Sequence, residues 1–171
     1  FEVVLLWAFC RDLWKKVMTA NRVLDGKMVA ALQRKRLKSN LDDLVARGLR
    51  AGLALICVGD HPASQVYIRN KITACDQVGI KSWVYRFEGQ RSERAVLNKI
   101  VELNSDDEVH GILVQLPLPR SFNIERVIEA IDPAKDVDGF HPVNIGKLFS
   151  GKALFSPCTP WGIMRLIDHY K

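Results

Sequence analysis

The sequence predicts an α/β domain whose mostly parallel sheet is flanked by helices. Short apolar segments alternate along the chain with longer segments of helical character, and this alternation indicates parallel strands joined by helices. The chain has 171 residues, of which 48% are hydrophobic and 26% charged. That length and composition are typical of one globular domain with a buried core rather than of a disordered chain.

The first predicted pair is a helix over residues 26–47 and a strand over residues 52–58. The helical segment mixes apolar and charged residues, contains no proline and ends before Gly48. The strand reads GLALICV, an apolar run without polar interruption. Such a run is typical of a strand that is covered on both faces.

A second helix and strand follow at residues 62–78 and 80–87. Pro62 suits the first turn of this helix, where its missing N–H costs no hydrogen bond, and Gly79 suits the end. The segment IKSWVYRF alternates polar and apolar residues, which predicts a strand.

The third pair is a helix over residues 91–104 and a strand over residues 110–116. The strand reads HGILVQL, and Pro117 and Pro119 stop it because proline cannot donate to a sheet. In a parallel sheet, ligands bind beyond the carboxyl ends of the strands. The first places to look for a site are therefore Gly59, Asp60 and the start of the following helix at one strand end, and Gln115 with the two prolines at another.

The rest of the chain is predicted to hold a helix near 123–131, a loop over DPAKDVDGFHP and a final helix from about Pro160. Residues 146–153, GKLFSGKA, nearly match a phosphate-binding loop. Ala153 stands where that motif needs a hydroxyl, and no apolar strand precedes it. We therefore interpret this segment as a turn-rich loop.

The net charge of +6 indicates an anionic partner, which a nucleic acid, an acidic lipid or an acidic small molecule would satisfy. The densest basic run of the sequence, RKRLK at 34–38, lies in a helical pattern and is interpreted as a solvated helix face. We expect no nucleic-acid partner, since the other basic residues are scattered along the sequence. We expect no membrane partner, since no apolar run approaches the ~18 residues of a membrane span.

Cysteine and histidine usage predicts no metal site. No C-x-x-C pair occurs, and no histidine lies near a cysteine at zinc-finger spacing. Unpaired cysteines are expected to be reduced, as in a cytoplasmic protein. The residues concerned are Cys10, Cys57, Cys75, Cys158, His61, His110, His141 and His169.

Residues 1–17 are predicted to be an extension foreign to the fold. They carry an apolar start without an initiator methionine, and Met18 begins a segment that looks like a natural start. They make a poor signal peptide, because a basic region and a small-residue cleavage site are lacking. An amphipathic helix is the competing interpretation, since the apolar residues recur at spacings of three and four.

A polar set falls at the predicted strand ends. Tyr67 and Lys71 are four apart on one helix face, which is consistent with a surface pair or with one wall of an active site. Gln115 ends an apolar strand and needs partners for a buried amide. Asp138 lies in an acidic, glycine-containing loop, where a carboxylate often stabilises a turn. We expect the four to line one cleft.

Four longer segments resemble successive signature blocks of the methylenetetrahydrofolate dehydrogenase/cyclohydrolase family. They read VGDHPASQVYIRNK, GILVQLPLP, DPAKDVDGFHPVNIGKL and PCTPWGIMRLI. They occur in the family's order and at about its spacing, and the similarity runs from about residue 20 to the end.

The resemblance implies a role for each residue of the polar set. Tyr67 matches the tyrosine that stacks near the folate, and Lys71 matches the catalytic lysine. Gln115 matches the glutamine that positions that lysine, and Asp138 matches the aspartate that holds the pterin. Further substrate-binding positions would form the pterin wall: Leu116, Pro117 and Pro119.

The resemblance also implies an activity in one-carbon metabolism and purine biosynthesis. In the family, 5,10-methylenetetrahydrofolate is oxidised by NADP⁺ to the methenyl form, which water then opens to 10-formyltetrahydrofolate. Hydride transfer depends mainly on positioning, whereas the hydrolysis needs a group that moves protons. A cytoplasmic homodimer that binds tetrahydrofolate derivatives is the expected form of the full-length enzyme.

The sequence departs from the family after the last block. Family members continue into a Rossmann domain that binds NADP, whereas this sequence stops at Lys171 and contains no G-x-G-x-x-G. We therefore expect residues 18–171 to be the catalytic domain only, from a fragment or a truncated reading frame, with no tight NADP binding. Two rival interpretations are a non-enzymatic folate-binding module and an assembly fragment that pairs with a full-length homologue.

Overall fold

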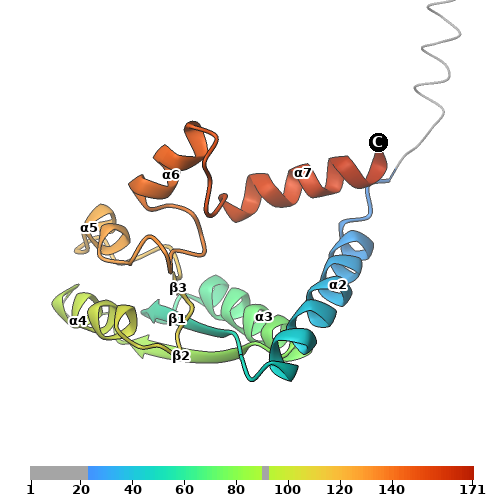
Figure 1. Ribbon diagram of the computed structural model, residues 1–171. Helices are drawn as coiled ribbons and strands as arrows, with labels where there is room; N and C mark the ends of the chain where they lie inside the picture. Colours follow the sequence, from blue (N-terminus) through green and yellow to red (C-terminus); the bar gives the residue numbers. More distant parts are fainter. Residues whose placement is uncertain (1–22, 90–92) are drawn as a thin grey trace, which may run out of the picture.

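The computed structural model describes residues 23–89 and 93–171 and shows a parallel sheet with helices on both sides (Figure 1). The sheet has three strands in the order β2-β1-β3. The central strand β1 (Gly52–Val58) pairs in parallel with β2 (Lys81–Phe87) and with β3 (Gly111–Val114). This confirms the predicted fold class and the three predicted strands.

The helices of the described residues alternate with these strands and then follow one another after β3. They are α2 (Gly26–Ala46), α3 (Pro62–Val78), α4 (Glu93–Asn104), α5 (Ile124–Glu129), α6 (Pro142–Phe149) and α7 (Cys158–Tyr170).

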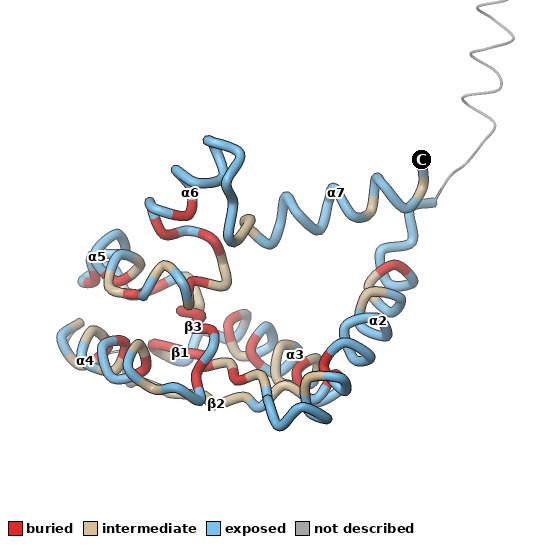
Figure 2. The backbone as a smooth tube through the Cα atoms, viewed as in Figure 1, coloured by how far each residue is buried: buried red, intermediate tan, exposed pale blue. Residues whose placement is uncertain are grey.

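The main core lies between one face of the sheet and helices α4 and α5 (Figures 1 and 2). Alternate residues of β1 enter it, because successive side chains of a strand point to opposite faces. The intervening residues Leu55 and Cys57 are also buried, on the face that α3 covers. The prediction that this strand is covered on both faces is confirmed. The core side chains from the strands and α4 are Ala54, Ile56, Val58, Val96, Ile100, Leu103, Ile112 and Val114.

Local sequence signals set the ends of the first two helices. The Asp25 side chain accepts hydrogen bonds from the N–H groups of Lys27 and Met28, which caps α2. Gly79 ends α3 with a φ of 88°, a left-handed conformation that glycine adopts without strain. Residues 34–38 are exposed on α2, as the interpretation of a solvated helix face predicts.

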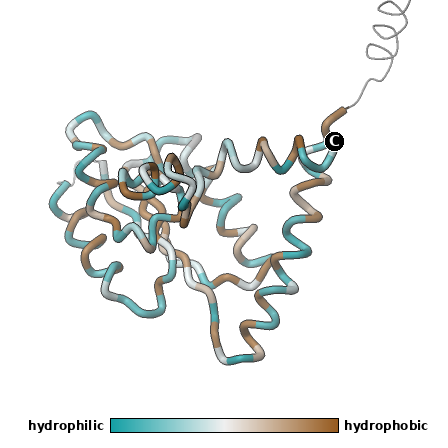
Figure 3. The backbone as a smooth tube through the Cα atoms, turned by 45° about the horizontal axis from the view of Figure 1, so that its top comes forward, coloured by the Kyte–Doolittle hydropathy of each residue, from teal (hydrophilic) through white to brown (hydrophobic). Residues whose placement is uncertain are grey.

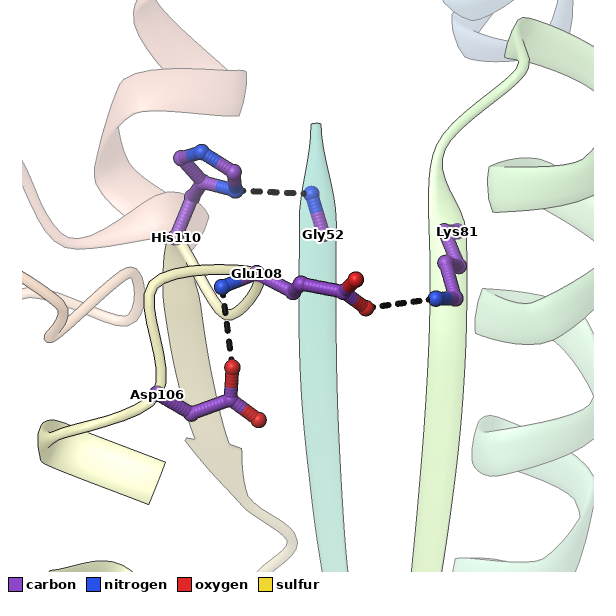
Figure 4. Close-up of polar contacts among 5 residues, drawn as sticks. All are labelled: Gly52, Lys81, Asp106, Glu108 and His110. Carbon is purple, nitrogen blue, oxygen red and sulfur yellow. Dashed lines mark hydrogen bonds and ion pairs between the residues drawn. The ribbon is translucent and has the colours of Figure 1, made fainter. Parts of the chain in front are cut away.

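The amino edge of the sheet is closed by a polar cluster (Figure 4). The Gly52 N–H donates to Nδ1 of His110 at 3.1 Å, and the His110 N–H donates to the Gly52 carbonyl at 2.9 Å. Glu108 pairs with Lys81 at 2.7 Å and donates its N–H to Asp106. These contacts join the starts of β1, β2 and β3, so they fix the register of the sheet at the edge opposite the carboxyl ends of the strands.

A Gly52→Ala substitution should destabilise the fold by about 1–3 kcal/mol or more, the range for forced overpacking. A Cβ atom at this position would lie 2.0 Å from the Glu108 carbonyl oxygen and 2.8 Å from the Trp83 ring. The carbonyl belongs to the backbone of the cluster, so it moves only if the sheet edge moves.

Urea unfolding followed by circular dichroism measures this effect. Gly26→Ala is the matched control, because a Cβ at Gly26 meets nothing within 4 Å. An unchanged unfolding midpoint in the Gly52 variant would show that the sheet edge adapts at no cost.

Residues 146–153 correct one prediction. The segment interpreted as a turn-rich loop begins inside α6, and only the residues after Phe149 form a turn. His141 caps this helix by accepting a hydrogen bond from the Val143 N–H, and Pro142 occupies its first turn. Pro142 suits the end of a loop as well as the first turn of a helix, so the sequence pattern does not mark where this helix begins.

Other boundaries differ from prediction by a few residues. The final helix begins at Cys158 rather than at Pro160, and the last strand ends at Val114 rather than at residue 116. The prediction for residues 1–17 concerns a segment outside the described residues.

Helix α7 runs from α6 to the start of α2, where the phenol oxygen of Tyr170 accepts a hydrogen bond from the Asp25 N–H at 3.0 Å (Figure 1). None of its residues is buried (Figure 2). Its apolar side chains nevertheless include Trp161, Ile163 and Met164, and Figure 3 shows the mixed hydropathy of this part of the chain. No described helix is both long and apolar enough to cross a membrane.

Candidate active site

The candidate site lies at the carboxyl edge of the sheet. Strands β1 and β3 run in parallel, so both end at this edge. Gln115 follows β3 directly, and its N–H donates to the Ile56 carbonyl of β1 at 2.8 Å. Helix α3 starts a few residues after β1 and carries Tyr67 and Lys71. The sequence order therefore brings residues of both segments to one place.

Lys71 and Gln115 form the central contact of the site. The Lys71 amine donates to Oε1 of Gln115 at 2.9 Å, and both residues are half-buried. The other end of the amide donates to the Leu116 carbonyl at 2.7 Å. Because both ends of the Gln115 side chain are engaged, its oxygen is held toward the amine. The predicted convergence of these two residues is thus present in the geometry.

Asp138 lies within electrostatic range of Lys71. Burial raises the pKa of the Asp138 carboxyl above its usual value, the Lys71 charge lowers it, and the charge of Asp136 raises it further. The net direction is upward, because the loss of water around the half-buried carboxyl outweighs the nearby amine. In this site burial and the Lys71 charge therefore act on the Asp138 pKa in opposite directions.

A small cavity with a volume of about 20 Å³ lies next to Asp138. This volume is roughly the room for one water molecule. Its wall is mostly apolar and consists of Ile112, Val114, Leu116, Leu118, Val127, Ile128, Ile131, Asp136, Asp138 and Phe140. Leu116 and Asp138 were predicted site residues, whereas Pro117 and Pro119 do not line this cavity.

Tyr67 is the most exposed member of the polar set. Its side chain is 61% exposed, one helical turn before Lys71 on α3. No hydrogen bond of the described residues joins the Tyr67 side chain to Lys71, Gln115 or Asp138. That Tyr67 forms a wall of the site, rather than being a surface residue only, therefore stays a prediction.

Sequence reasoning missed three residues around Asp138. Asp136 and Asn144 are buried, and Asp136 lines the cavity. The Cys158 thiol donates to the Val137 carbonyl, and burial, followed by the charge of Asp138, raises the pKa of this thiol. The spacing D-x-D in the loop was a usable signal for Asp136. Asn144 lies in the helix that was not predicted, so it carried no signal.

The arrangement suits proton transfer to a bound molecule. An amine that is oriented by a neutral amide can donate or accept a proton at a fixed point, and the nearby carboxyl can accept N–H groups. Among residues 23–89 and 93–171, no group of three or more His, Cys, Asp or Glu side chains could hold a metal ion. The groups that the site itself offers are the amine of Lys71, the amide of Gln115 and the carboxyl of Asp138.

Comparison with known proteins identifies the family. Residues 24–138 match the model of the tetrahydrofolate dehydrogenase/cyclohydrolase catalytic domain. The chain is 50% identical over 147 residues to bifunctional protein FolD 2 of Bordetella pertussis, which covers 86% of this chain and 52% of that protein. It is 51% identical over 154 residues to bifunctional protein FolD of Burkholderia mallei, which covers 90% of this chain and 54% of the relative.

Solved structures agree with these matches. The bifunctional FolD dehydrogenase/cyclohydrolase of Campylobacter jejuni superposes with a TM-score of 0.85 at 46% identity, over 87% of this chain and 53% of that one. The Trypanosoma brucei enzyme, solved with NADP cofactor and inhibitor, gives 0.84 at 31% identity, over 87% and 52%. The chain thus spans about half the length of the relatives it matches. It belongs to the tetrahydrofolate dehydrogenase/cyclohydrolase family, and residues 24–138 match that family's catalytic domain.

Proposed function

We propose that this chain is the folate-binding, catalytic half of a methylenetetrahydrofolate dehydrogenase/cyclohydrolase. The observation that carries the proposal is the Lys71–Gln115 hydrogen bond of 2.9 Å at the carboxyl edge of a parallel sheet. Membership of the family supports it, as does the carboxyl of Asp138 within electrostatic range of the amine. The substrate class is tetrahydrofolate derivatives, in one-carbon metabolism.

Lys71 is the proposed catalytic residue of the hydrolytic half-reaction. When water adds to a methenyltetrahydrofolate cation, the water loses one proton. As the carbon–nitrogen bond then breaks, the departing nitrogen gains a proton, and the new hydroxyl releases its own to solvent and becomes the formyl oxygen. A single amine beside the reacting carbon can carry out both transfers in turn. Gln115 holds this amine in place, and it adds no charge that would trap the proton on Lys71.

Asp138 is the proposed anchor of the pterin ring. A pterin presents N–H donors along one edge, and an ionised carboxylate accepts them. Tyr67 is proposed to contact the folate from α3, and Leu116 with the prolines 117 and 119 to form the apolar wall beside the ring. A planar ring held between an apolar wall and a carboxylate has one preferred orientation.

The dehydrogenase half-reaction needs NADP⁺, which accepts a hydride from the methylene carbon. The turn between β1 and α3, Gly-Asp-His-Pro at 59–62, does not suit its pyrophosphate. Asp60 adds a negative charge there, and Pro62 lacks the N–H that a phosphate would need. This turn therefore does not hold NADP⁺ for hydride transfer. A cytoplasmic homodimer as the form of the whole enzyme is part of the same proposal.

Calorimetric titration of the chain with 5-formyltetrahydrofolate tests the proposal. We expect saturable binding that weakens as the pH falls through the pKa of Asp138, which burial has raised, because only the ionised carboxylate accepts pterin N–H groups. Asp138→Asn should bind about 10- to 100-fold more weakly at neutral pH, the value of hydrogen bonds to a charged group, and should lack this acid dependence.

Asp132→Asn is the matched control, since Asp132 is an exposed carboxylate that accepts only the local Ala134 N–H. The pH dependence of binding by this control variant also contains any contribution from protonation of the ligand's own carboxyl groups. Absence of binding by the unmodified chain, or equal binding by the Asp138 and Asp132 variants, would overturn the proposed function.

A further inference from the structure

Asp136 is a buried charge that the proposed chemistry does not use. Its side chain is 1% exposed, two residues before Asp138. A buried carboxylate is costly unless hydrogen bonds replace its lost water. Three N–H groups do so here: those of Gly139 at 3.1 Å and His141 at 2.9 Å, and the side-chain amide of Asn144 at 2.9 Å. Residues 136–141 are thus gathered around one carboxylate, and we call them the 136–141 turn.

The two ends of this carboxylate bind different parts of the turn. Oδ1 accepts from Gly139, the residue after Asp138, whereas Oδ2 accepts from His141 and from Asn144. In the sequence, Asp138 lies between Asp136 and Gly139, the first of these donors. Its backbone is therefore enclosed in a ring that the Asp136 side chain closes.

The 136–141 turn is also fixed from outside. On the strand side, Asp136 forms a bridge with Ile112 of β3, and the Ile112 N–H donates to the Lys135 carbonyl at 2.7 Å. On the opposite side, a Cβ at Gly139 would lie 3.0 Å from backbone atoms of Ser156 and Pro157, just before α7. The turn is wedged between the sheet and the start of α7, which leaves Asp138 little freedom of backbone position.

Asn144 joins the Asp136 carboxylate to α6. It is fully buried, and its amide group donates to Oδ2 of Asp136 and to the Pro133 carbonyl, both at 2.9 Å. Its own oxygen has no hydrogen-bond partner in the described structure. The two N–H groups of this amide therefore tie α6 to the Asp136 carboxylate and to the Pro133 carbonyl.

We propose that Asp136 is a positioning residue, which holds the 136–141 turn so that the Asp138 carboxylate meets the pterin in one orientation. This inference rests on the proposed function, because it takes Asp138 as the pterin anchor. The negative charge of Asp136 also has an electrostatic effect on the same site, which a residue remote from Asp138 would not have. It faces Asp138 across the turn and opposes the ionisation of that carboxyl.

The electrostatic effect has a definite sign. The charged groups that act on Asp138 are Lys71 from α3, which lowers its pKa, and Asp136, which raises it; burial raises it most. The Cys158 thiol of α7 also lies within range of Asp138. Removing the charge of Asp136 leaves burial and Lys71 in place, so the pKa of Asp138 falls.

Asp136→Asn tests the inference in the whole chain, with 5-formyltetrahydrofolate as the probe. The variant keeps the shape of the side chain, but its amide nitrogen cannot accept an N–H group. We expect affinity at neutral pH to fall about 10- to 100-fold. We also expect the acid limb of binding to move to lower pH. Unfolding of part of the sample would instead lower the number of binding sites per chain and leave the limb where it is.

The outcomes separate the two proposals. If the unmodified chain fails to bind, the proposed function falls and takes this inference with it. If the unmodified chain binds and Asp136→Asn matches the Asp132→Asn control in affinity and acid limb, only the positioning role is overturned.

Asn144→Ala serves if Asp136→Asn fails to fold. It removes one donor and leaves the charge of Asp136 in place. At a temperature where circular dichroism shows the native fold, we expect its affinity to fall while the acid limb stays where it is in the unmodified chain. Unchanged affinity in this variant would overturn the inference.

Discussion

Lys71→Met should lower the hydrolysis of 5,10-methenyltetrahydrofolate by about 10²–10⁴-fold, the range for loss of a general acid–base group. Methionine keeps much of the bulk of the lysine stem but has no proton to transfer. It also removes the donor to Oε1 of Gln115, the contact at the centre of the site. Folate binding should change far less, because the proposed pterin anchor is Asp138.

The measurement needs an enzyme with both halves. A chimera in which this chain replaces the matching half of the Burkholderia mallei relative is suitable, since the two are 51% identical over 154 residues. Lys38→Met is the matched control: Lys38 is an exposed lysine of α2 that pairs with Asp42. Hydrolysis by the Lys71 variant at the rate of the Lys38 variant would rule out the acid–base role.

The strands and their cover were predictable because they depend on local composition. A continuous apolar run such as 52–58 can lie only where both faces are buried, and the structure buries it so. Pro62 and Gly79 marked the ends of α3 because backbone geometry restricts these two residues at any site. Helix α6 was missed because its proline follows a loop-like segment, where the same residue is also common.

The site was predictable in part for a topological reason. Parallel strands end at one edge, so residues placed after β1 and β3 had to be neighbours, and Lys71 does meet Gln115 although 44 residues separate them. The role of Asp136 was not predictable. A carboxylate in a glycine-containing loop has the same sequence signature whether it is exposed at a turn or buried at its centre. Only the packing of β3, α6 and the start of α7 around it decides between them.

A polypeptide of these 171 residues alone should show no NADP⁺-dependent oxidation of 5,10-methylenetetrahydrofolate. The sequence contains no G-x-G-x-x-G, and the β1–α3 turn carries Asp60 and Pro62 where a phosphate would need N–H groups. A nicotinamide that is not held over the folate must meet it by diffusion. The reaction then loses the effective concentration of about 10⁵–10⁸ M that a well-oriented pair gains.

The assay follows the absorbance of methenyltetrahydrofolate after 5,10-methylenetetrahydrofolate and NADP⁺ are added to the purified chain. The chimera with the Burkholderia mallei half supplies the positive control, because it joins the remainder of a bifunctional relative to the same proposed folate site. Hydrolysis of added methenyltetrahydrofolate by the chain alone should persist at a low rate, since water needs no cofactor site. Steady methenyl formation above the buffer rate would instead show that this chain alone holds the nicotinamide in place, which would contradict the prediction.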